Sequence, residues 1–179
     1  MATTINQQLA IGIDIGGTNT KFGIVDTHGN VLFSGDISTR GYDDVNAFID
    51  EVHKTLLPII EKAGGIGRVK GIGVGAPNGN YYTGTVEYAP NLPWKGIIPL
   101  AKKFQNKFHL PVTITNDANA AAIGEMMYGA AKGMKDFVMI TLGTGVGSGF
   151  VANGQLIYGH DGFAGEFGHT IIIPDGRLH

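Results

Sequence analysis

The 179-residue sequence contains no cysteine, which excludes disulfide bonds and thiolate metal sites within this stretch. It has no large excess of charge, because 13 lysines and arginines are balanced by 15 aspartates and glutamates. This balance gives no electrostatic reason to expect nucleic acid or an anionic membrane as a partner. No apolar run reaches the roughly 18 residues of a membrane helix, and the N-terminus lacks a signal-peptide pattern. We therefore expect a cytoplasmic protein without nucleic-acid or membrane partners.

Glycine, by contrast, is abundant, with 29 residues that lie in clusters. Glycine weakens helices and strands, so a cluster marks a place where the backbone turns sharply or approaches a ligand. Apolar residues make up 43% of the chain, which is enough for a packed core. The glycine clusters are therefore where function is expected.

Apolar patterning in the first third of the chain predicts a sheet followed by a helix. The segments 9–14, 21–25 and 31–35 are apolar and joined by short turns, which predicts three antiparallel strands. Apolar residues then recur at helical spacing over 45–63. Pro58 lies within this helix and is expected to kink or end it.

The rest of the chain predicts a second strand–helix series and a further hairpin. We expect one β-β-β-α-β-α-β lobe over residues 1–118, then a linking helix and the start of a second lobe over 119–179. The expected elements are a strand at 69–75, a long loop to Gly96, a helix over 100–108, a strand at 112–115, a helix from 116 to about Ala131, and strands at 137–142 and 148–152.

The first glycine cluster, Asp-Ile-Gly-Gly-Thr-Asn-Thr-Lys at 14–21, lies between the first two predicted strands. Its glycines let backbone N–H groups turn toward an anion, and its threonine and lysine add a hydroxyl and a cation. The aspartate can hold a Mg²⁺-bound water near phosphates. A strand follows the glycines, whereas the Rossmann and P-loop motifs require a helix. The alternative is an ordinary glycine hairpin. The candidate phosphate and Mg²⁺ residues are Asp14, Gly16, Gly17, Thr18 and Lys21.

A second glycine cluster at 141–149 repeats this strand–turn–strand design. A nucleotide clamped between two lobes would require such a repeat, and Thr144 and Gly145 are its candidate phosphate-binding residues. Alone a glycine-rich turn is weak evidence, but the pairing of two at a lobe-length interval strengthens both.

Asn116 and Asp117 stand at the start of a predicted helix after an apolar strand. A carboxylate or amide at this place is favoured simply as a helix cap. The functional alternative is that Asp117 is a general base that accepts a proton from a substrate hydroxyl.

Two further segments carry polar side chains suited to the binding of vicinal hydroxyls. Glu166 and His169, three residues apart, can face the same way and offer acceptors and a donor. The long loop that contains Gly79 and Asn91 can supply an amide, although turn chemistry alone also favours Asn. A purely structural role for His169 is the alternative.

Taken together, these residues resemble the ROK family of repressors, open reading frames and kinases. The most specific stretches are 142–150 (Leu-Gly-Thr-Gly-Val-Gly-Ser-Gly-Phe), 153–160 (Asn-Gly-Gln-Leu-Ile-Tyr-Gly-His) and 165–169 (Gly-Glu-Phe-Gly-His). The resemblance implies an α/β fold, namely a ribonuclease H-like lobe of the actin/hexokinase/Hsp70 ATPase type with the start of a second lobe. It also implies a glucokinase-like, ATP- and Mg²⁺-dependent kinase that phosphorylates a hexose, glucose first, at its 6-hydroxyl.

The resemblance assigns roles to individual residues. It implies that Asp117 is the catalytic base. It places Gly79, Asn91, Asn116, Glu166 and His169 on the sugar, and Asp14, Gly16, Gly17, Thr18, Lys21, Thr144 and Gly145 at the phosphates and Mg²⁺.

Two features depart from the family pattern. Many members bind a structural zinc through the histidine that matches His169 and three downstream cysteines, and His179 stands where the first cysteine would be. Two histidines do not make a closed zinc site, so zinc is expected only in a full-length parent. Family kinases are also longer, so we expect an incomplete fragment that is a poor kinase alone and self-associates as a homo-oligomer through exposed apolar strands.

Other functions remain open at this point. A sugar-sensing repressor would carry a helix-turn-helix before the phosphate loop, for which there is no room ahead of Asp14. A sugar-binding protein without kinase activity would keep the hydroxyl-binding residues. Fructose, mannose, allose or an N-acetylated amino sugar would suit the same site, and polyphosphate is a possible alternative phosphate donor.

Overall fold

The computed structural model of the chain describes residues 8–143, 145–174 and 176. Three antiparallel strands open it: β1 (Leu9–Ile15), β2 (Asn19–Asp26) and β3 (Val31–Ser38). They form the predicted meander, in which Asp14 of β1 lies opposite Lys21 of β2.

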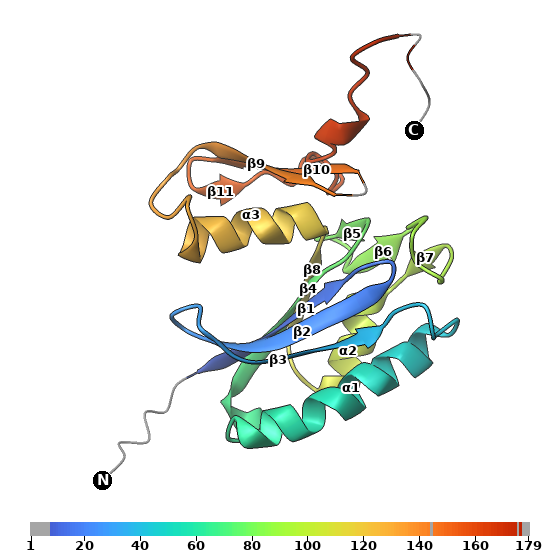
Figure 1. Cartoon of the computed structure of the whole chain (residues 1–179), viewed down its shortest axis with the longest axis vertical. Coiled ribbons are helices and arrows are strands. Elements are labelled where there is room, and N and C mark those ends of the chain that lie inside the picture. Colours follow the sequence, from blue (N-terminus) through green and yellow to red (C-terminus); the bar gives the residue numbers. More distant parts are fainter. Residues whose placement is uncertain (1–7, 144, 175, 177–179) are drawn as a thin grey trace.

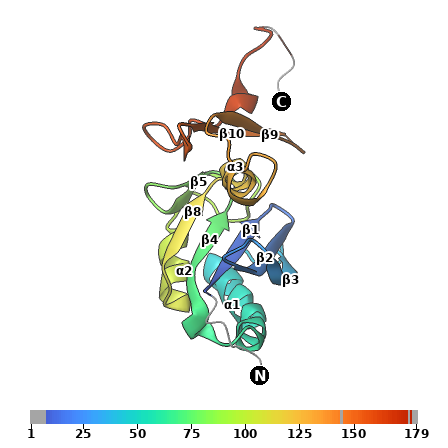
Figure 2. The ribbon, with the colours of Figure 1, turned by 90° about the vertical axis from the view of Figure 1, so that its left-hand side faces the viewer.

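Two parallel strands extend this meander into a five-stranded sheet. β4 (Val69–Gly75) pairs with β1, and β8 (Val112–Thr115) pairs with β4, which gives the order β3-β2-β1-β4-β8. The crossovers carry α1 (Val45–Lys62) and α2 (Leu100–Phe108), which lie against the same side of the sheet (Figures 1 and 2). The short helix η1 (Ile66–Arg68) leads into β4. Parallel strands need such crossovers because a tight turn cannot join them.

The hydrophobic core lies between the sheet and these two helices. Alternate residues of β1, including Ile11 and Ile13, point into it and meet Phe48 and Phe104 from α1 and α2. Asp44 caps the N-terminus of α1, and its carboxylate accepts a hydrogen bond from the backbone N–H of Asn46 at 3.0 Å.

Pro58 was expected to kink or end helix α1; it does not end the helix, which continues to Lys62. Proline removes one helical hydrogen bond and crowds the preceding turn. Leu56 and Ile60, on either side of it, are both fully buried. The burial of these side chains accounts for a helix that persists through the proline.

The segment between β4 and α2 is not the plain loop that was expected. It contains a small antiparallel sheet with the order β5-β6-β7, formed by β5 (Gly79–Asn80), β6 (Thr85–Glu87) and β7 (Ile97–Ile98). The side-chain amide of Asn78 donates to the carbonyl of Glu87 at 2.9 Å and closes this unit. Strands of two or three residues are too short to show an alternating pattern.

Helix α3 (Asp117–Tyr128) lies above the other face of the five-stranded sheet and below a second sheet (Figure 1). The second sheet has the order β11-β10-β9 and consists of β9 (Phe137–Leu142), β10 (Val146–Ala152) and β11 (Gln155–Leu156). The short helix η2 (Phe167–His169) follows. No helix among the described residues is long and apolar enough to cross a membrane.

Helix α3 ends three residues earlier than expected, at Tyr128 rather than near Ala131. The carboxylate of Glu125 accepts a hydrogen bond from the backbone N–H of Ala130 at 2.7 Å, and Gly129 caps the last turn. Alanine favours helix strongly, but this side-chain bond holds the backbone in a non-helical turn.

Candidate functional site

A cleft of about 810 Å³ lies between α3 and the face of the five-stranded sheet that α1 and α2 leave free. Its floor includes Gly12, Gly73 and Gly75, whose lack of side chains leaves the space open. Charged side chains line its edge. The predicted site residues that line it are Asp14, Gly16, Lys21 and Asp117.

Two positions of the turn between β1 and β2, Gly16 and Gly17, have room only for glycine. A side chain at Gly16 would come within 2.8 Å of the carbonyl oxygen of Asn19, and one at Gly17 within 2.7 Å of that of Asn91. The turn is closed by a 3.0 Å hydrogen bond from the N–H of Gly16 to Asn19. The predicted phosphate loop therefore packs against a predicted sugar-binding residue, whereas the exposed Thr18 does not line the cleft.

Three charged groups meet at the mouth of this turn. The pKa of the Asp14 carboxyl is raised, first by partial desolvation in the cleft and then by the negative charge of Asp117, while Lys21 opposes the rise. The carboxylates of Asp14 and Asp117 repel each other, and a divalent cation between them would relieve this repulsion. The ammonium group of Lys21 could at the same time contact phosphates bound to that cation. Mg²⁺ is commonly held in this way, by one or two carboxylates together with substrate phosphates, so the donor set fits.

The second glycine turn joins β9 to β10. The N–H of Gly143 donates to the carbonyl of Gly145 at 3.0 Å, and the space around Gly145 is open. Thr141, at the end of β9, lines the same cleft as Asp14. Gly145 itself is exposed and is not among the cleft residues, and Thr144 lies outside the described residues.

At the start of α3 the adjacent residues Asn116 and Asp117 have different roles. Asn116 is the helix cap, since its side-chain oxygen accepts a hydrogen bond from the N–H of Asn119 at 2.7 Å. Asp117 occupies the first helical position, is exposed, and accepts a bond from the N–H of Ala118 at 2.9 Å. Capping by Asn116 leaves the Asp117 carboxylate available in the cleft. Gly79 packs directly on the carbonyl of Thr115, just before this pair.

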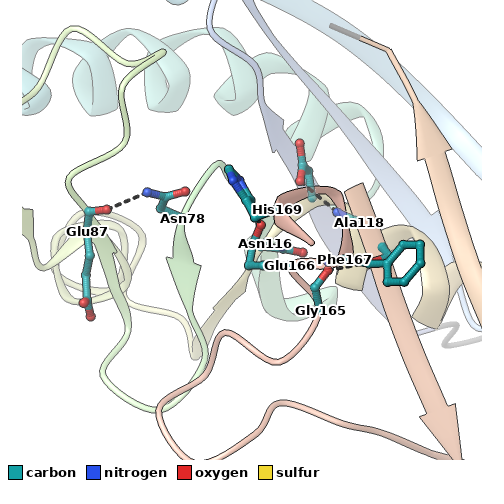
Figure 3. A network of polar contacts seen from close by, with 10 residues as sticks. Asn78, Glu87, Asn116, Ala118, Gly165, Glu166, Phe167 and His169 are labelled. Atoms are coloured by element: carbon teal, nitrogen blue, oxygen red, sulfur yellow. Dashed lines mark hydrogen bonds and ion pairs between the residues drawn. The ribbon is translucent and has the colours of Figure 1, made fainter. Parts of the chain in front are cut away.

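A second cluster forms where the turn before η2 meets the start of α3. The amide of Asn116 donates to the carboxylate of Glu166 at 3.2 Å, and the ring of His169 lies 3.8 Å from the other carboxylate oxygen. Figure 3 shows these three side chains gathered at one place. Glu166 is 36% exposed and His169 is 85% exposed, so both can reach a ligand from solvent.

The described residues do not fit a zinc ion. They contain no group of three or more His, Cys, Asp or Glu side chains able to hold a metal. His169 has Glu166 as its neighbour, and His179 lies outside the described residues. A closed structural zinc site needs four ligands, and the described residues do not supply them.

Sequence reasoning missed a group of aromatic and amide side chains that joins β5 to the loop after β11. The rings of Tyr81 and Tyr158 stack at 4.2 Å, and the Tyr82 hydroxyl donates to the carbonyl of Gly159 at 3.0 Å. The amide of Asn80 donates to the carbonyl of Asp161 at 2.8 Å. Tyr158 also lines the cleft, and burial followed by its tyrosine neighbours raises its pKa. The pair Tyr81-Tyr82 is the only sequence signal for this contact.

Comparison with known proteins gives one consistent family. The model of the ROK family matches residues 10–178. A glucokinase of Streptomyces coelicolor is 40% identical over 171 residues, which cover 95% of this chain and 52% of the relative. A xylose repressor of Caldicellulosiruptor bescii is 35% identical, over 90% of this chain and 41% of the repressor.

Solved structures agree. A ROK family glucokinase of Streptomyces griseus, determined in complex with glucose and AMPPNP, superposes with a TM-score of 0.80 at 38% identity, over 94% of this chain and 52% of that one. The fold class predicted from the sequence, an actin/hexokinase-type α/β lobe with the start of a second, is confirmed. The chain spans about half the length of the glucokinases it matches. The boundary near residue 118 stays a prediction.

Proposed function

Because the chain belongs to the ROK family, we propose that it supplies the sugar site and part of the phosphate site of an ATP-dependent hexose kinase, with glucose as the first substrate to test. The meeting of Asp14, Lys21 and Asp117 in one cleft carries this proposal. Two carboxylates beside a lysine and a glycine-only turn suit a metal–nucleotide better than an uncharged ligand.

Asp117 is the proposed general base. Its carboxylate accepts the proton of the sugar 6-hydroxyl while a bond forms between that oxygen and the γ-phosphorus of ATP. The bond from this phosphorus to the bridging oxygen breaks, and ADP leaves with that electron pair. The exposed first position of α3, next to the cap of Asn116, leaves the carboxylate free for this step.

The sugar is proposed to lie against the Asn116–Glu166 pair. A carboxylate that already accepts one hydrogen bond retains acceptor capacity for sugar hydroxyls, and the Asn116 oxygen is occupied by the helix cap. Asn91, Gly79 and His169 are the other proposed contacts. Buried polar groups left unpaired by a wrong sugar would provide discrimination.

The phosphates are proposed to lie over the glycine turns. The N–H of Gly17, with Lys21 and Thr18, is proposed to contact the phosphates, while the N–H of Gly16 closes the turn on the carbonyl of Asn19. Thr144 and Gly145 are the other proposed phosphate contacts. Mg²⁺, when bound with ATP, neutralises charge that develops on the transferred group. Asp14 would hold this ion through its waters. Positioning and neutralisation supply most of the acceleration in such transfers.

A regulatory sugar-binding protein without turnover is the second candidate, because a xylose repressor is among the relatives. The two candidates share the proposed sugar contacts and differ in whether Asp117 acts as a general base. A regulator would bind sugar without releasing ADP.

We also propose that the 179 residues alone turn over poorly and self-associate. Within the described part of the chain β9 pairs only with β10, so its other edge is open. Val138, Ile140 and Leu142 along it are 50%, 48% and 81% exposed. An open apolar edge of this kind is a template for pairing with another strand.

The test is ADP release with ATP, Mg²⁺ and a panel of hexoses, measured on the 179-residue chain and on the natural protein that carries it. Hexose-dependent release by the natural protein supports the kinase. Sugar binding without release would favour the regulator.

A further inference from the structure

Ser148 lies in the middle of β10 and is fully buried, with 0% exposure. Its hydroxyl donates to the carbonyl of Gly165 at 2.6 Å and accepts from the N–H of Phe167 at 3.2 Å. These two backbone groups flank Glu166 on either side. One side chain therefore fixes the backbone both before and after the carboxylate, in the turn shown in Figure 3.

The turn also packs closely against Ser148 of β10 and Asn119 of α3. A side chain at Gly165 would approach the carbonyl oxygen of Ser148 within 2.5 Å and the side-chain oxygen of Asn119 within 3.2 Å. Glycine is therefore needed at Gly165 for the turn to reach the serine. The two hydrogen bonds of Ser148 and the close packing of Gly165 together fix the position of this turn against β10 and α3.

Glu166 itself has few anchors of its own. Its side chain is 36% exposed, and its contacts are the Asn116 amide at 3.2 Å and the exposed ring of His169 at 3.8 Å. A half-exposed carboxylate held in this way takes its position largely from its backbone. The residue that fixes that backbone thereby fixes where the carboxylate lies.

We propose that Ser148 is the positioning residue for Glu166, and that its hydroxyl sets the affinity of the site for the sugar hydroxyls that Glu166 accepts. This inference rests on the proposed function and deepens it. Ser148 touches no reacting atom. Its effect is exerted on sugar binding, in the ground state and the transition state alike, and not on the nucleotide.

The test is a double-mutant cycle in the natural protein that carries this chain. Ser148→Ala is expected to raise the KM for glucose about tenfold, with kcat and the KM for ATP changed less than about twofold, because uniform binding is lost. In a Glu166→Gln background the same serine substitution should change the glucose KM less than about twofold. Glucose affinity measured by calorimetry should follow the same pattern and is a readout independent of turnover.

Two further variants separate positioning from stability. Ser148→Cys replaces the hydroxyl with a larger thiol that is a weaker hydrogen-bond donor. It should also raise the glucose KM, and it serves as the second variant if Ser148→Ala fails to fold. Asn30→Ala removes a 2.9 Å bond to Asp26 in the β2–β3 turn of the five-stranded sheet and should lower the melting temperature without changing the glucose KM.

The inference is overturned if the serine variants fold and bind glucose normally, or if their effect is the same with and without the Glu166 carboxylate. A wild-type protein that neither binds nor phosphorylates any hexose would instead overturn the proposed function, so the two failures are distinguishable.

Discussion

The side-chain amide of Asn116 donates to the carboxylate of Glu166 at 3.2 Å, across fifty residues of sequence. This bond joins the cap of α3 to the turn before η2, and so links the helix that carries Asp117 to the second sheet. The sugar site we propose is built on this link. Each of the changes below alters the link or one of the groups around it.

Replacement of Asn116 should separate its capping role from its role at the site. Asn116→Ala loses the helix cap and is expected to lower the free energy of unfolding by about 1 kcal/mol. Asn116→Asp keeps a capping oxygen but replaces the donor to Glu166 with a second negative charge. Both variants should bind glucose more weakly, whereas only the alanine variant loses the cap. Urea unfolding and calorimetry check the two effects, and tight glucose binding by either variant would contradict the assignment.

Asp14→Asn should affect stability and activity in opposite directions. The folded protein raises the pKa of Asp14 above its ordinary value of 3.8, because partial burial and Asp117 disfavour the charged form. The contribution of Asp14 to stability is therefore full below pH 3.8 and is lost as the pH rises through the folded pKa. At neutral pH the variant is expected to melt no lower than wild type, with the difference vanishing below pH 3.8, while Mg²⁺-dependent turnover is lost. A clearly lower melting temperature at pH 7 would contradict this account.

The glycine-only turn gives a steric prediction. Gly17→Ala places a methyl group 2.7 Å from the carbonyl oxygen of Asn91, so the turn and the Asn91 loop must move apart. We expect at least a tenfold loss of kcat/KM, about 1.4 kcal/mol in transition-state binding. Gly41→Ala, with no atom within 4 Å of the added methyl, is the matched control and should behave as wild type. Equal kinetics for the two variants would show that the turn tolerates a side chain.

The contact between β5 and the loop after β11 should determine how readily this loop detaches from β5. Asn80 is 4% exposed and donates to the carbonyl of the exposed Asp161 at 2.8 Å, so Asn80→Ala removes the bond that ties this loop to β5. The expected cost is about 0.5–1.5 kcal/mol, with faster amide hydrogen exchange over residues 157–162. Tyr82→Phe, which loses the single bond to Gly159 from an exposed ring, should have a smaller effect. Unchanged exchange in the Asn80 variant would show that the loop is held by other contacts.

Much of the fold was readable from the sequence, because its central strands are long and apolar. β1, β4 and β8 were placed within a residue of their bounds. The small sheet of β5, β6 and β7 was missed because two- and three-residue strands carry no periodic signal. The end of α3 was misplaced because a side-chain bond from Glu125, not helix propensity, decides it.

The site was readable in part. Motif spacing led to Asp14, Lys21 and Asp117, which the structure brings to one cleft. No local pattern reveals that Asn116 meets Glu166, since their contact depends on how the second sheet packs on α3. The role of Ser148 was hidden for the same reason, although a serine within a run of glycines was visible.

The most direct test of the central claim is hexose-dependent ADP release by the natural protein that carries this chain, compared between wild type and Asp117→Asn with ATP, Mg²⁺ and glucose. Loss of a general base should lower kcat by about 10²–10⁴-fold, while the affinity for glucose stays within about threefold because Asn116 and Glu166 remain. Turnover by the variant at a rate comparable to wild type would contradict the assignment of the base, and no release by wild type with any hexose would contradict the kinase itself.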